Sequence, residues 1–403
     1  MSLPSDERLP VAVLFGIPGV KKAGMLEQLL RGRRDLRVAL IVNETVEAGD
    51  VAVSAMASRA HVTLIQGCIC CERRKDFLAE VRRLVAENRF DRLIVESGGI
   101  CDPLSMAAIF AARDIEGYCL SDIARLDTFV TFVNASSLID DYFSGDSLAA
   151  RVPALGVKDQ RPFATLLADQ LEFASVIVLN EIDMLDITER QRAQALVRAL
   201  NPSARIVGTL GGELSSCDIL GTGDFDFGTA RRATGCAHTL RGEALPQLPG
   251  VHIHGFVYRA RRPFHPQRLV KLLNGGFPGV VRAKGHFWLA TRMEWVGELS
   301  IVGRVASYEP LGFWWATVPD EARAMAMPHI KDWDPQYGDR CQELVFVGMD
   351  MDEARLRWRL NGCLLTDAEM ARGPAAWVRL PDPLPRWEMA LPSEDALTRL
   401  LGL

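Results

Sequence analysis

The sequence of 403 residues lacks several features that would place it in other classes of protein. It has no apolar run close to the ~20 residues that a membrane-spanning helix needs, so we expect no such helix. Its net charge is only −5, without the basic excess that is typical of a nucleic-acid-binding protein. The segment from Met1 to Pro10 lacks the apolar core of a secretory signal. Together these absences predict a globular protein of the cytoplasm, with no nucleic-acid or membrane partner.

A regular disulfide framework is also absent. The nine cysteines are an odd number, and three of them (Cys68, Cys70 and Cys71) fall within four residues. In a reducing compartment such clustering indicates metal or redox chemistry rather than disulfides. The other six are scattered, and we expect most of them to be small buried side chains. They are Cys101, Cys119, Cys217, Cys236, Cys341 and Cys363.

Short apolar runs alternate with amphipathic stretches through residues 1–230, which predicts β-α-β units around a parallel sheet. The runs are nearly continuous in apolar character, as expected of strands that are covered on both faces. The predicted fold class is therefore α/β. The predicted strands are residues 11–15, 38–42, 62–65, 92–95, 128–133 and 176–179.

The composition changes after this region. Residues 231–250 are rich in glycine, proline and polar side chains, and we interpret them as a linker. In residues 251–403 tryptophan is concentrated between Trp288 and Trp387. This part is predicted to be a smaller α+β domain. Its predicted strands are residues 255–258 and 343–347, and its predicted helices are residues 266–273 and 352–360.

A glycine-rich loop, residues 16–23 (GIPGVKKA), follows the first predicted strand and precedes a helical pattern. This order is typical of a P-loop, in which backbone N–H groups and a lysine bind phosphate. Gly16 and Lys22 match that motif. Lys21 stands where the second glycine is usual, and Ala23 replaces the hydroxyl residue that binds Mg²⁺. Taken alone, the loop is equally compatible with an ordinary glycine turn.

Two more strand ends carry nucleotide-binding patterns. Residues 96–99 (ESGG) follow a strand in the position of a Walker-B segment and switch. Residues 180–183 (NEID) are a form of Asn-Lys-x-Asp, in which Asp183 could pair with guanine and Asn180 could brace the loop. Glu181 replaces the lysine of that motif. The three patterns in this order predict descent from a GTPase.

The cysteine cluster, residues 66–71 (QGCICC), lies between these patterns. On a continuous strand Cys68 and Cys70 would share one face and Cys71 would oppose them. A turn, which Gly67 permits, would let all three thiolates bind one Zn²⁺, Cu(I) or iron ion. Three protein ligands would leave one position open for exchange. The alternative is a set of buried, inert thiols. By position, the candidates for a fourth ligand are Cys101, Glu44 and Glu47.

With these motifs the chain resembles the CobW-type GTPase metallochaperones, in the branch of zinc chaperones and nitrile hydratase activators. The resemblance implies a P-loop G domain of the SIMIBI class followed by a CobW C-terminal domain. It further implies delivery of a transition metal (zinc, iron or cobalt) to a client metalloenzyme, nitrile hydratase among the candidates, with GTP and Mg²⁺ gating metal affinity. The matching segments are residues 67–71, 96–103, 166–183, 256–266, 284–290 and 333–348.

The resemblance also assigns roles to single residues. Its implied metal ligands are Cys68, Cys70 and Cys71, and its implied nucleotide-binding residues are Gly16, Gly19, Lys22, Asn180 and Asp183. Apart from the resemblance, Lys21 and Lys22 supply two cations that could bind an anion. Four departures from the family pattern fall on the nucleotide site and none on the cysteines. These departures are Lys21, Ala23, Asn134 and Glu181. We therefore expect metal handling to be kept and GTP hydrolysis to be weakened or lost. An active GTPase and a metal-independent assembly factor are the alternatives.

Overall fold

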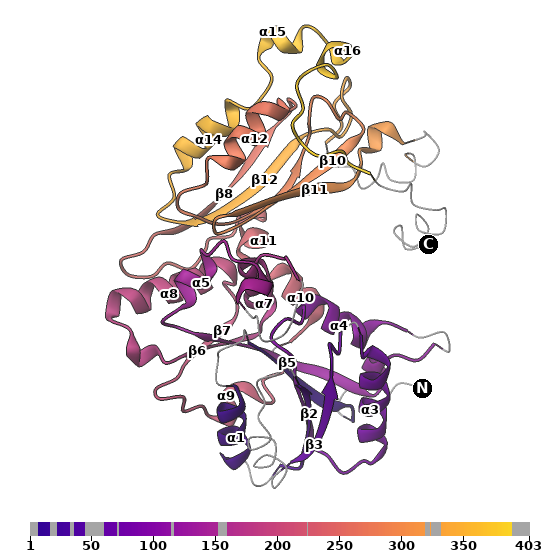
Figure 1. The fold of residues 1–403 in the computed structure, drawn as a ribbon, viewed down its shortest axis with the longest axis vertical. Helices are drawn as coiled ribbons and strands as arrows, with labels where there is room; N and C mark the ends of the chain where they lie inside the picture. The colour runs from indigo at the N-terminus through magenta and orange to yellow at the C-terminus, as the bar shows by residue number, and fades with distance from the viewer. Residues whose placement is uncertain are drawn as a thin grey trace. The chain divides into compact units, whose positions relative to one another are not determined.

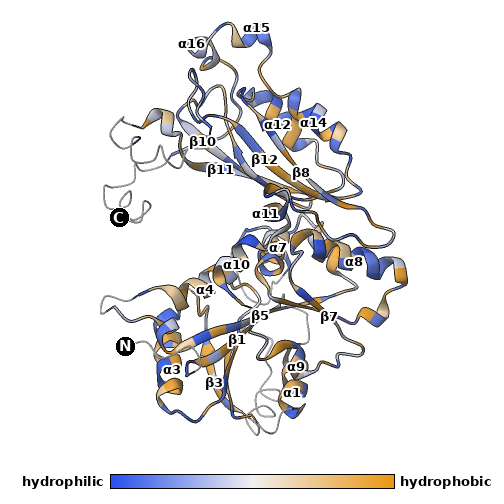
Figure 2. Cartoon of the chain, turned by 180° about the vertical axis from the view of Figure 1, so that it is seen from behind, coloured by the Kyte–Doolittle hydropathy of each residue, from blue (hydrophilic) through white to orange (hydrophobic). Residues whose placement is uncertain are grey.

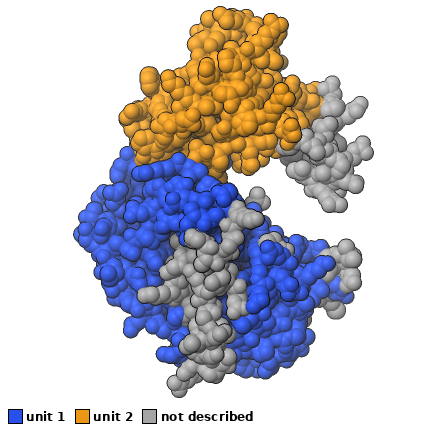
Figure 3. Space-filling model, in the orientation of Figure 1, with its two compact units in different colours: residues 1–255, 302–305, 347–350 blue, residues 256–301, 306–346, 351–403 orange. Residues whose placement is uncertain are grey.

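The computed structural model describes residues 7–16, 22–32, 36–44, 60–70, 72–113, 117–151, 159–223, 225–318, 323 and 332–388. The chain divides into two compact units, which are coloured separately in Figure 3. Unit 1 comprises residues 1–255, 302–305 and 347–350, and unit 2 comprises residues 256–301, 306–346 and 351–403. Within the described part of the chain, no helix has both the length and the apolar character needed to cross a membrane.

The predicted domain boundaries (residues 1–230, 231–250 and 251–403) stay a prediction. The structure places one short helix, α11 (Gly235–Leu240), inside the segment interpreted as a linker. Another, α10 (Phe227–Arg232), lies at its start. Asp226 and Thr234 cap these helices by accepting backbone hydrogen bonds. At least one polar residue of this segment, Thr234, therefore serves as a helix cap.

Unit 1 is built on a seven-stranded sheet in the order β3-β2-β4-β1-β5-β6-β7 (Figure 1). All of its pairings are parallel, which confirms the predicted α/β class. The strands are β1 (Leu9–Gly16), β2 (Val38–Glu44), β3 (His61–Gln66), β4 (Arg92–Glu96), β5 (Ala124–Asn134), β6 (Val176–Asn180) and β7 (Arg205–Gly208). The sequence prediction missed β7, because this edge strand is short and only half-buried and has no apolar run.

Helices of unit 1 pack on the faces of this sheet. The described helices of eight or more residues are α1 (Lys22–Gly32), α3 (Arg74–Ala86), α4 (Pro103–Ala111), α7 (Phe163–Phe173) and α8 (Ile187–Leu200). In α3 the buried residues Phe77, Val81 and Leu84 recur at helical spacing. Figure 2 shows hydrophilic and hydrophobic residues alternating along this helix, as an amphipathic helix requires.

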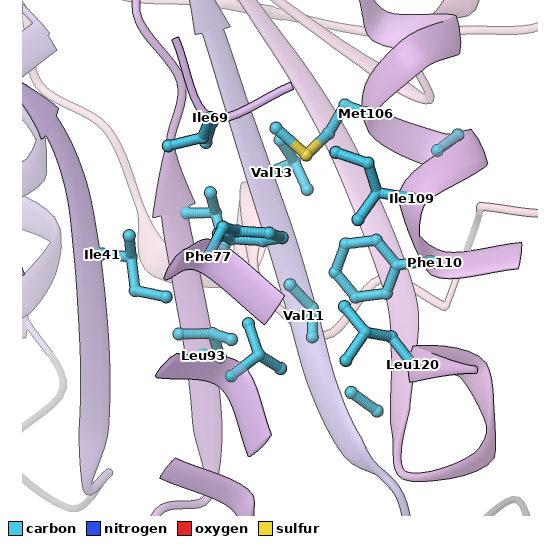
Figure 4. Packing of buried hydrophobic residues seen from close by; sticks show 14 of the residues in the cluster. Val11, Val13, Ile41, Ile69, Phe77, Leu93, Met106, Ile109, Phe110 and Leu120 are labelled. Atoms are coloured by element: carbon cyan, nitrogen blue, oxygen red, sulfur yellow. The ribbon is translucent and has the colours of Figure 1, made fainter. Parts of the chain in front are cut away.

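The core between α3, α4 and the sheet is visible in Figure 4. Val11 and Val13 of β1 lie beneath Phe77 of α3 and Phe110 of α4, and all four are fully or almost fully buried. The two phenylalanine rings meet edge to face with their centroids 6.1 Å apart, a favourable aromatic geometry. This packing holds the two helices against one face of the central strands.

Unit 2 is built on a five-stranded sheet in the order β11-β10-β9-β12-β8. Its strands are β8 (Ile253–Ala260), β9 (Val280–Phe287), β10 (Trp295–Val302), β11 (Val305–Phe313) and β12 (Gln342–Met349), and its longer helices are α12 (Pro266–Asn274) and α14 (Glu353–Asn361). Strands β10 and β11 are joined by Gly303 and Arg304 alone, so they form a hairpin. The predicted α+β character is confirmed, whereas β9, β10 and β11 were missed.

Glu369 shows how polar contacts stabilise unit 2. This residue of α15 (Asp367–Met370) accepts hydrogen bonds from Arg268 at 2.7 Å and from the backbone N–H of Thr366 at 2.8 Å. Burial by itself raises the pKa of Glu369, but these hydrogen bonds bring it down to about 2. An unfolded glutamate titrates near pH ~4.3. The ionised Glu369 carboxylate therefore stabilises the folded state fully above about pH 5. This contribution is lost as the pH falls toward about 2.

We expect the wild type to be more stable than Glu369→Gln at neutral pH. The difference between their free energies of unfolding should narrow as the pH falls from about 5 to about 3, because the wild-type carboxylate loses its ionised advantage. Urea titrations followed by tryptophan fluorescence measure this difference. A difference that stays constant or widens on acidification would contradict the assignment.

Candidate metal centre

Three cysteine thiols from two segments of unit 1 meet at the carboxyl end of the sheet. The sulfur atoms of Cys68, Cys70 and Cys101 all lie within 4.8 Å of one another. Cys68 and Cys70 follow β3, and Cys101 follows β4, with only β2 between these strands. The structure thus unites two of the predicted ligands with Cys101, a candidate that the sequence offered by position only. Cys71 and Glu47 lie outside the described residues, as does the side chain of Glu44.

The first segment is a turn that begins at Gly67. This residue has a φ of +91°, a left-handed conformation that favours glycine. A Cβ atom there would lie 3.0 Å from a carboxylate oxygen of Glu72. The backbone N–H of Arg73 donates to the Cys68 carbonyl at 2.9 Å and closes the turn. This turn is what brings the Cys68 and Cys70 sulfurs to 2.9 Å, a distance at which one thiol donates to the other.

Two contacts anchor the turn to the sheet. The side chain of Ile69, between the two cysteines, is fully buried among Val13, Phe77 and Met106 (Figure 4). Asn43, at the end of β2 and almost fully buried, donates from Nδ2 to the Gly67 carbonyl at 2.9 Å. The turn is therefore held by a polar contact before Cys68 and by an apolar contact between Cys68 and Cys70.

The second segment is the turn after β4. The Cys101 N–H donates to the Gly98 carbonyl at 2.9 Å, and the side chain is 1% exposed. Asp102 then caps α4 by accepting from the backbone N–H groups of Leu104 (3.2 Å) and Ser105 (2.9 Å). Cys101 consequently stands at the positive end of a nine-residue helix, an environment that favours a thiolate.

The two neighbouring thiols oppose ionisation of Cys101 in the absence of a metal. Hydrogen bonding to Cys68 and to Cys70, and then burial, raise the pKa of the Cys101 thiol well above its ordinary value. A bound divalent cation reverses this balance, because a coordinating thiol is deprotonated outright. The donor set therefore fits a thiophilic metal such as Zn²⁺.

The predicted phosphate-binding residues are only partly described. Gly16 is the last residue of β1, and Lys22 is the first residue of α1. Gly19 and Lys21 lie outside the described residues, and nothing is described of the Lys22 side chain. On the neighbouring strand, Ser97 donates from both its backbone N–H and its hydroxyl to the Leu14 carbonyl, each at 3.0 Å. This ties the turn that leads to Cys101 to the strand that leads to the predicted phosphate loop.

The predicted base-reading residues lie where β5, β6 and β7 end. Asn180 is buried, donates from Nδ2 to Oδ1 of Asn134 at 3.2 Å and accepts from the Thr209 hydroxyl at 2.8 Å. Glu181 follows with a left-handed φ of +56°, and Asp183 is exposed. The side chain of Asn180 thus braces three strand ends, and its predicted role toward guanine stays a prediction.

Two buried amides at the metal centre, Asn43 and Gln170, escaped the sequence analysis. Gln170 lies in α7 and donates to the carbonyls of Gly99 and Cys101. A polar residue among the buried positions of α7 is the one signal the sequence offered. The partners are 71 and 69 residues away in the chain, a pairing that no local pattern reveals.

Comparison with known proteins gives matches along both parts of the chain. Residues 10–208 match the CobW/HypB/UreG nucleotide-binding domain, and residues 253–364 match the C-terminal domain of the cobalamin synthesis protein CobW. A zinc-regulated GTPase metalloprotein activator 1 of Dictyostelium discoideum is 35% identical over 401 residues, which cover 94% of this chain and 84% of that protein. A zinc chaperone of Mycobacterium tuberculosis is 28% identical over 370 residues, covering 88% of this chain and 86% of that protein.

Among solved structures, the Zn(II)-bound YjiA GTPase from E. coli is 18% identical. The alignment covers 89% of this chain and 99% of that chain, with a TM-score of 0.41.

Proposed function

The chain belongs to the CobW/HypB/UreG family of nucleotide-binding proteins, with a CobW C-terminal domain, and from this premise we propose that it is a metallochaperone that carries zinc to a client metalloenzyme. Cys68, Cys70 and Cys101 bind the metal, and Cys71 completes the cysteine motif. The observation that carries this proposal is the convergence of three sulfur atoms within 4.8 Å at the carboxyl end of the sheet.

Metal is cargo in this proposal, so the site must release it as well as bind it. Cys68 and Cys70 are each partly exposed, whereas Cys101 is buried. Exposed thiolates offer a route by which a ligand of the client can enter the coordination sphere, replace one sulfur and leave the others bound. A three-sulfur site with one exchangeable position supports transfer better than a closed four-ligand structural site.

The zinc content of purified protein tests the proposal. Under reducing conditions we expect one zinc ion per chain in the wild type and none in a variant with Cys68→Ser, Cys70→Ser and Cys71→Ser. Zinc is measured by mass spectrometry after passage over a weak chelating resin, with Cys217→Ser, an exposed cysteine, as the control. An unchanged zinc content in the triple variant would overturn the proposal.

We further propose that GTP hydrolysis is weak or absent. Lys21 in place of glycine crowds the position of phosphate, and Ala23 removes the hydroxyl ligand of Mg²⁺. The double variant Lys21→Gly, Ala23→Thr should therefore raise GTP turnover at least about 10-fold, because it restores the metal that stabilises the transferring phosphoryl group. Phosphate release measures turnover, and Lys22→Ala in the double-variant background is the control.

The second candidate function is a working GTPase that couples hydrolysis to metal delivery. The relative from Dictyostelium discoideum is named a zinc-regulated GTPase metalloprotein activator, which favours this candidate. Rapid turnover by the wild type that is lost in Lys22→Ala would establish it. A metal-independent assembly factor is the third candidate, and client activation that survives chelation and the triple cysteine change would favour it.

The client is proposed only as a class. An enzyme with a thiolate- or histidine-ligated metal fits a cargo that is already held by sulfur. A nitrile-hydratase-type enzyme, whose metal would be iron or cobalt, and a zinc enzyme are the two cases to compare. Transfer from protein loaded with Zn²⁺, Co²⁺ or Fe²⁺ to each metal-free client distinguishes them.

A further inference from the structure

Gln170 connects a buried helix to the turn that carries Cys101. It lies in α7 and is 1% exposed. Its Nε2 donates to the Gly99 carbonyl at 3.1 Å and to the Cys101 carbonyl at 3.3 Å. The backbone of Gln170 is held separately, because the Thr131 hydroxyl of β5 donates to the Gln170 carbonyl at 2.8 Å. One side-chain amide therefore binds the peptide group that precedes Ile100 and the peptide group that follows Cys101.

The turn needs such a contact. It contains Gly98 and Gly99 in succession, and glycine has the greatest backbone freedom of any residue. The described contacts that fix the backbone of the turn are the Cys101 N–H bond to Gly98 and the two bonds from Gln170. The direction of the Cys101 Cα–Cβ bond follows from the two peptide planes beside it. Fixing these planes fixes that bond and leaves the sulfur only the staggered positions about χ1.

The two ends of the Gln170 amide differ in their contacts. Its Oε1 atom is buried and has no hydrogen-bond partner among the described residues, and burying an acceptor without a partner costs about 1–3 kcal/mol. A methionine or leucine would avoid that cost at similar volume, but it would leave the Gly99 and Cys101 carbonyls without their donor. The contribution of Gln170 to this turn therefore comes from its Nε2 group.

We propose that Gln170 is a positioning residue of the metal centre, which holds the Cys101 thiolate toward Cys68 and Cys70. The inference rests on the proposed function, because it requires Cys101 to be a ligand. Without Gln170 the three thiols of the metal centre are still present. Ordering the turn that carries Cys101 around the metal then costs conformational entropy. Gln170 therefore acts on metal affinity through Cys101 and through no other ligand.

The test compares the apparent zinc dissociation constants of the wild type and four variants by competition with a chromophoric chelator. Gln170→Met removes the N–H donors at similar volume, and we expect it to raise the constant about 10- to 100-fold, the usual effect of a lost partner of a metal ligand. Thr131→Val removes the neighbouring contact to the same residue but keeps the amide. We expect it to change the constant less than about 3-fold. Far-UV circular dichroism checks that each variant folds.

The remaining two variants are Cys101→Ser alone and Cys101→Ser combined with Gln170→Met. If Gln170 acts through Cys101, Gln170→Met has no further effect on zinc affinity in the Cys101→Ser background. An unchanged constant for Gln170→Met, or an equal loss in both backgrounds, overturns the inference. If Gln170→Met does not fold, Gln170→Leu takes its place, and failure of both to fold also overturns it. Failure of the proposed function is distinct, because the wild type itself would then bind no zinc.

Discussion

Replacing Cys101 with serine is expected to weaken zinc binding by more than the ~10- to 100-fold that a lost partner of a metal ligand costs. Cys101 contributes one of three sulfur atoms that lie within 4.8 Å of one another, and a serine hydroxyl is a far poorer ligand for zinc at neutral pH. Competition with a chromophoric chelator under reducing conditions measures the dissociation constant.

Cys119→Ser is the matched control for that experiment. Cys119 is also buried in unit 1, and its thiol donates to the Phe110 carbonyl at 3.4 Å. It lies outside the three-sulfur cluster, so its replacement should leave zinc affinity unchanged. Equal effects of the two serine variants would mean that Cys101 influences zinc through the fold rather than as a ligand.

The second large effect is expected at Asn201, the residue that ends α8. Its side chain is fully buried. Nδ2 donates to the carbonyls of Leu171, Glu172 and Ala174 at 3.0, 3.1 and 2.8 Å, and Oδ1 accepts from the Ala204 N–H at 3.0 Å. A single amide thus provides hydrogen-bond partners for backbone groups at the end of α7 and in the segment that leads into β7.

Asn201→Asp keeps the acceptor but replaces the donor with a second oxygen that faces three carbonyl groups. At about 1–3 kcal/mol for each buried polar group left unpaired, we expect a loss of about 4 kcal/mol in the free energy of unfolding of unit 1. The exposed residue Asn274 provides the same chemical change as a control, and Asn274→Asp should cost less than about 0.5 kcal/mol.

The distribution of tryptophan makes this measurement specific to one unit. All eight tryptophans lie between Trp288 and Trp387, so their fluorescence reports on unit 2. Far-UV circular dichroism reports on both units. In urea titrations, Asn201→Asp should lower the midpoint that circular dichroism reports for unit 1. The midpoint that tryptophan fluorescence reports for unit 2 should change much less. A loss of less than about 1 kcal/mol in the free energy of unfolding of unit 1 would contradict the role assigned to the Asn201 amide.

The sequence predicted the frame of unit 1 because its inner strands are buried on both faces. In β1 seven of the eight residues are buried, and such a run is visible without any tertiary information. The strand β11 is different, because none of its nine residues is fully buried and its polar and apolar residues are mixed. Its pairing in the sheet, rather than an apolar run, makes it a strand.

The residues of the candidate site also divide into those that the sequence predicts and those that only the assembled fold brings together. Cys68 and Cys70 were predictable because they are neighbours in the chain and Gly67 permits a turn. Cys101 was named only by its place after a strand, since its approach to the other thiols depends on the strand order β3-β2-β4. Asn43 and Gln170 depend on contacts across 24 and about 70 residues of chain. Such contacts exist only once the sheet and α7 are assembled.

The absorption spectrum of the Co²⁺-loaded protein tests the central claim most directly, because cobalt reports both the number of thiolates and the coordination geometry at a site that would hold zinc. We predict a sulfur-to-cobalt charge-transfer band together with the visible bands of a tetrahedral ion, at one Co²⁺ per chain. The charge-transfer intensity should fall by about a third in Cys101→Ser and vanish when Cys68, Cys70 and Cys101 are all serine. A wild-type spectrum without the charge-transfer band, or one that the triple variant reproduces, would contradict a thiolate metal centre in this protein.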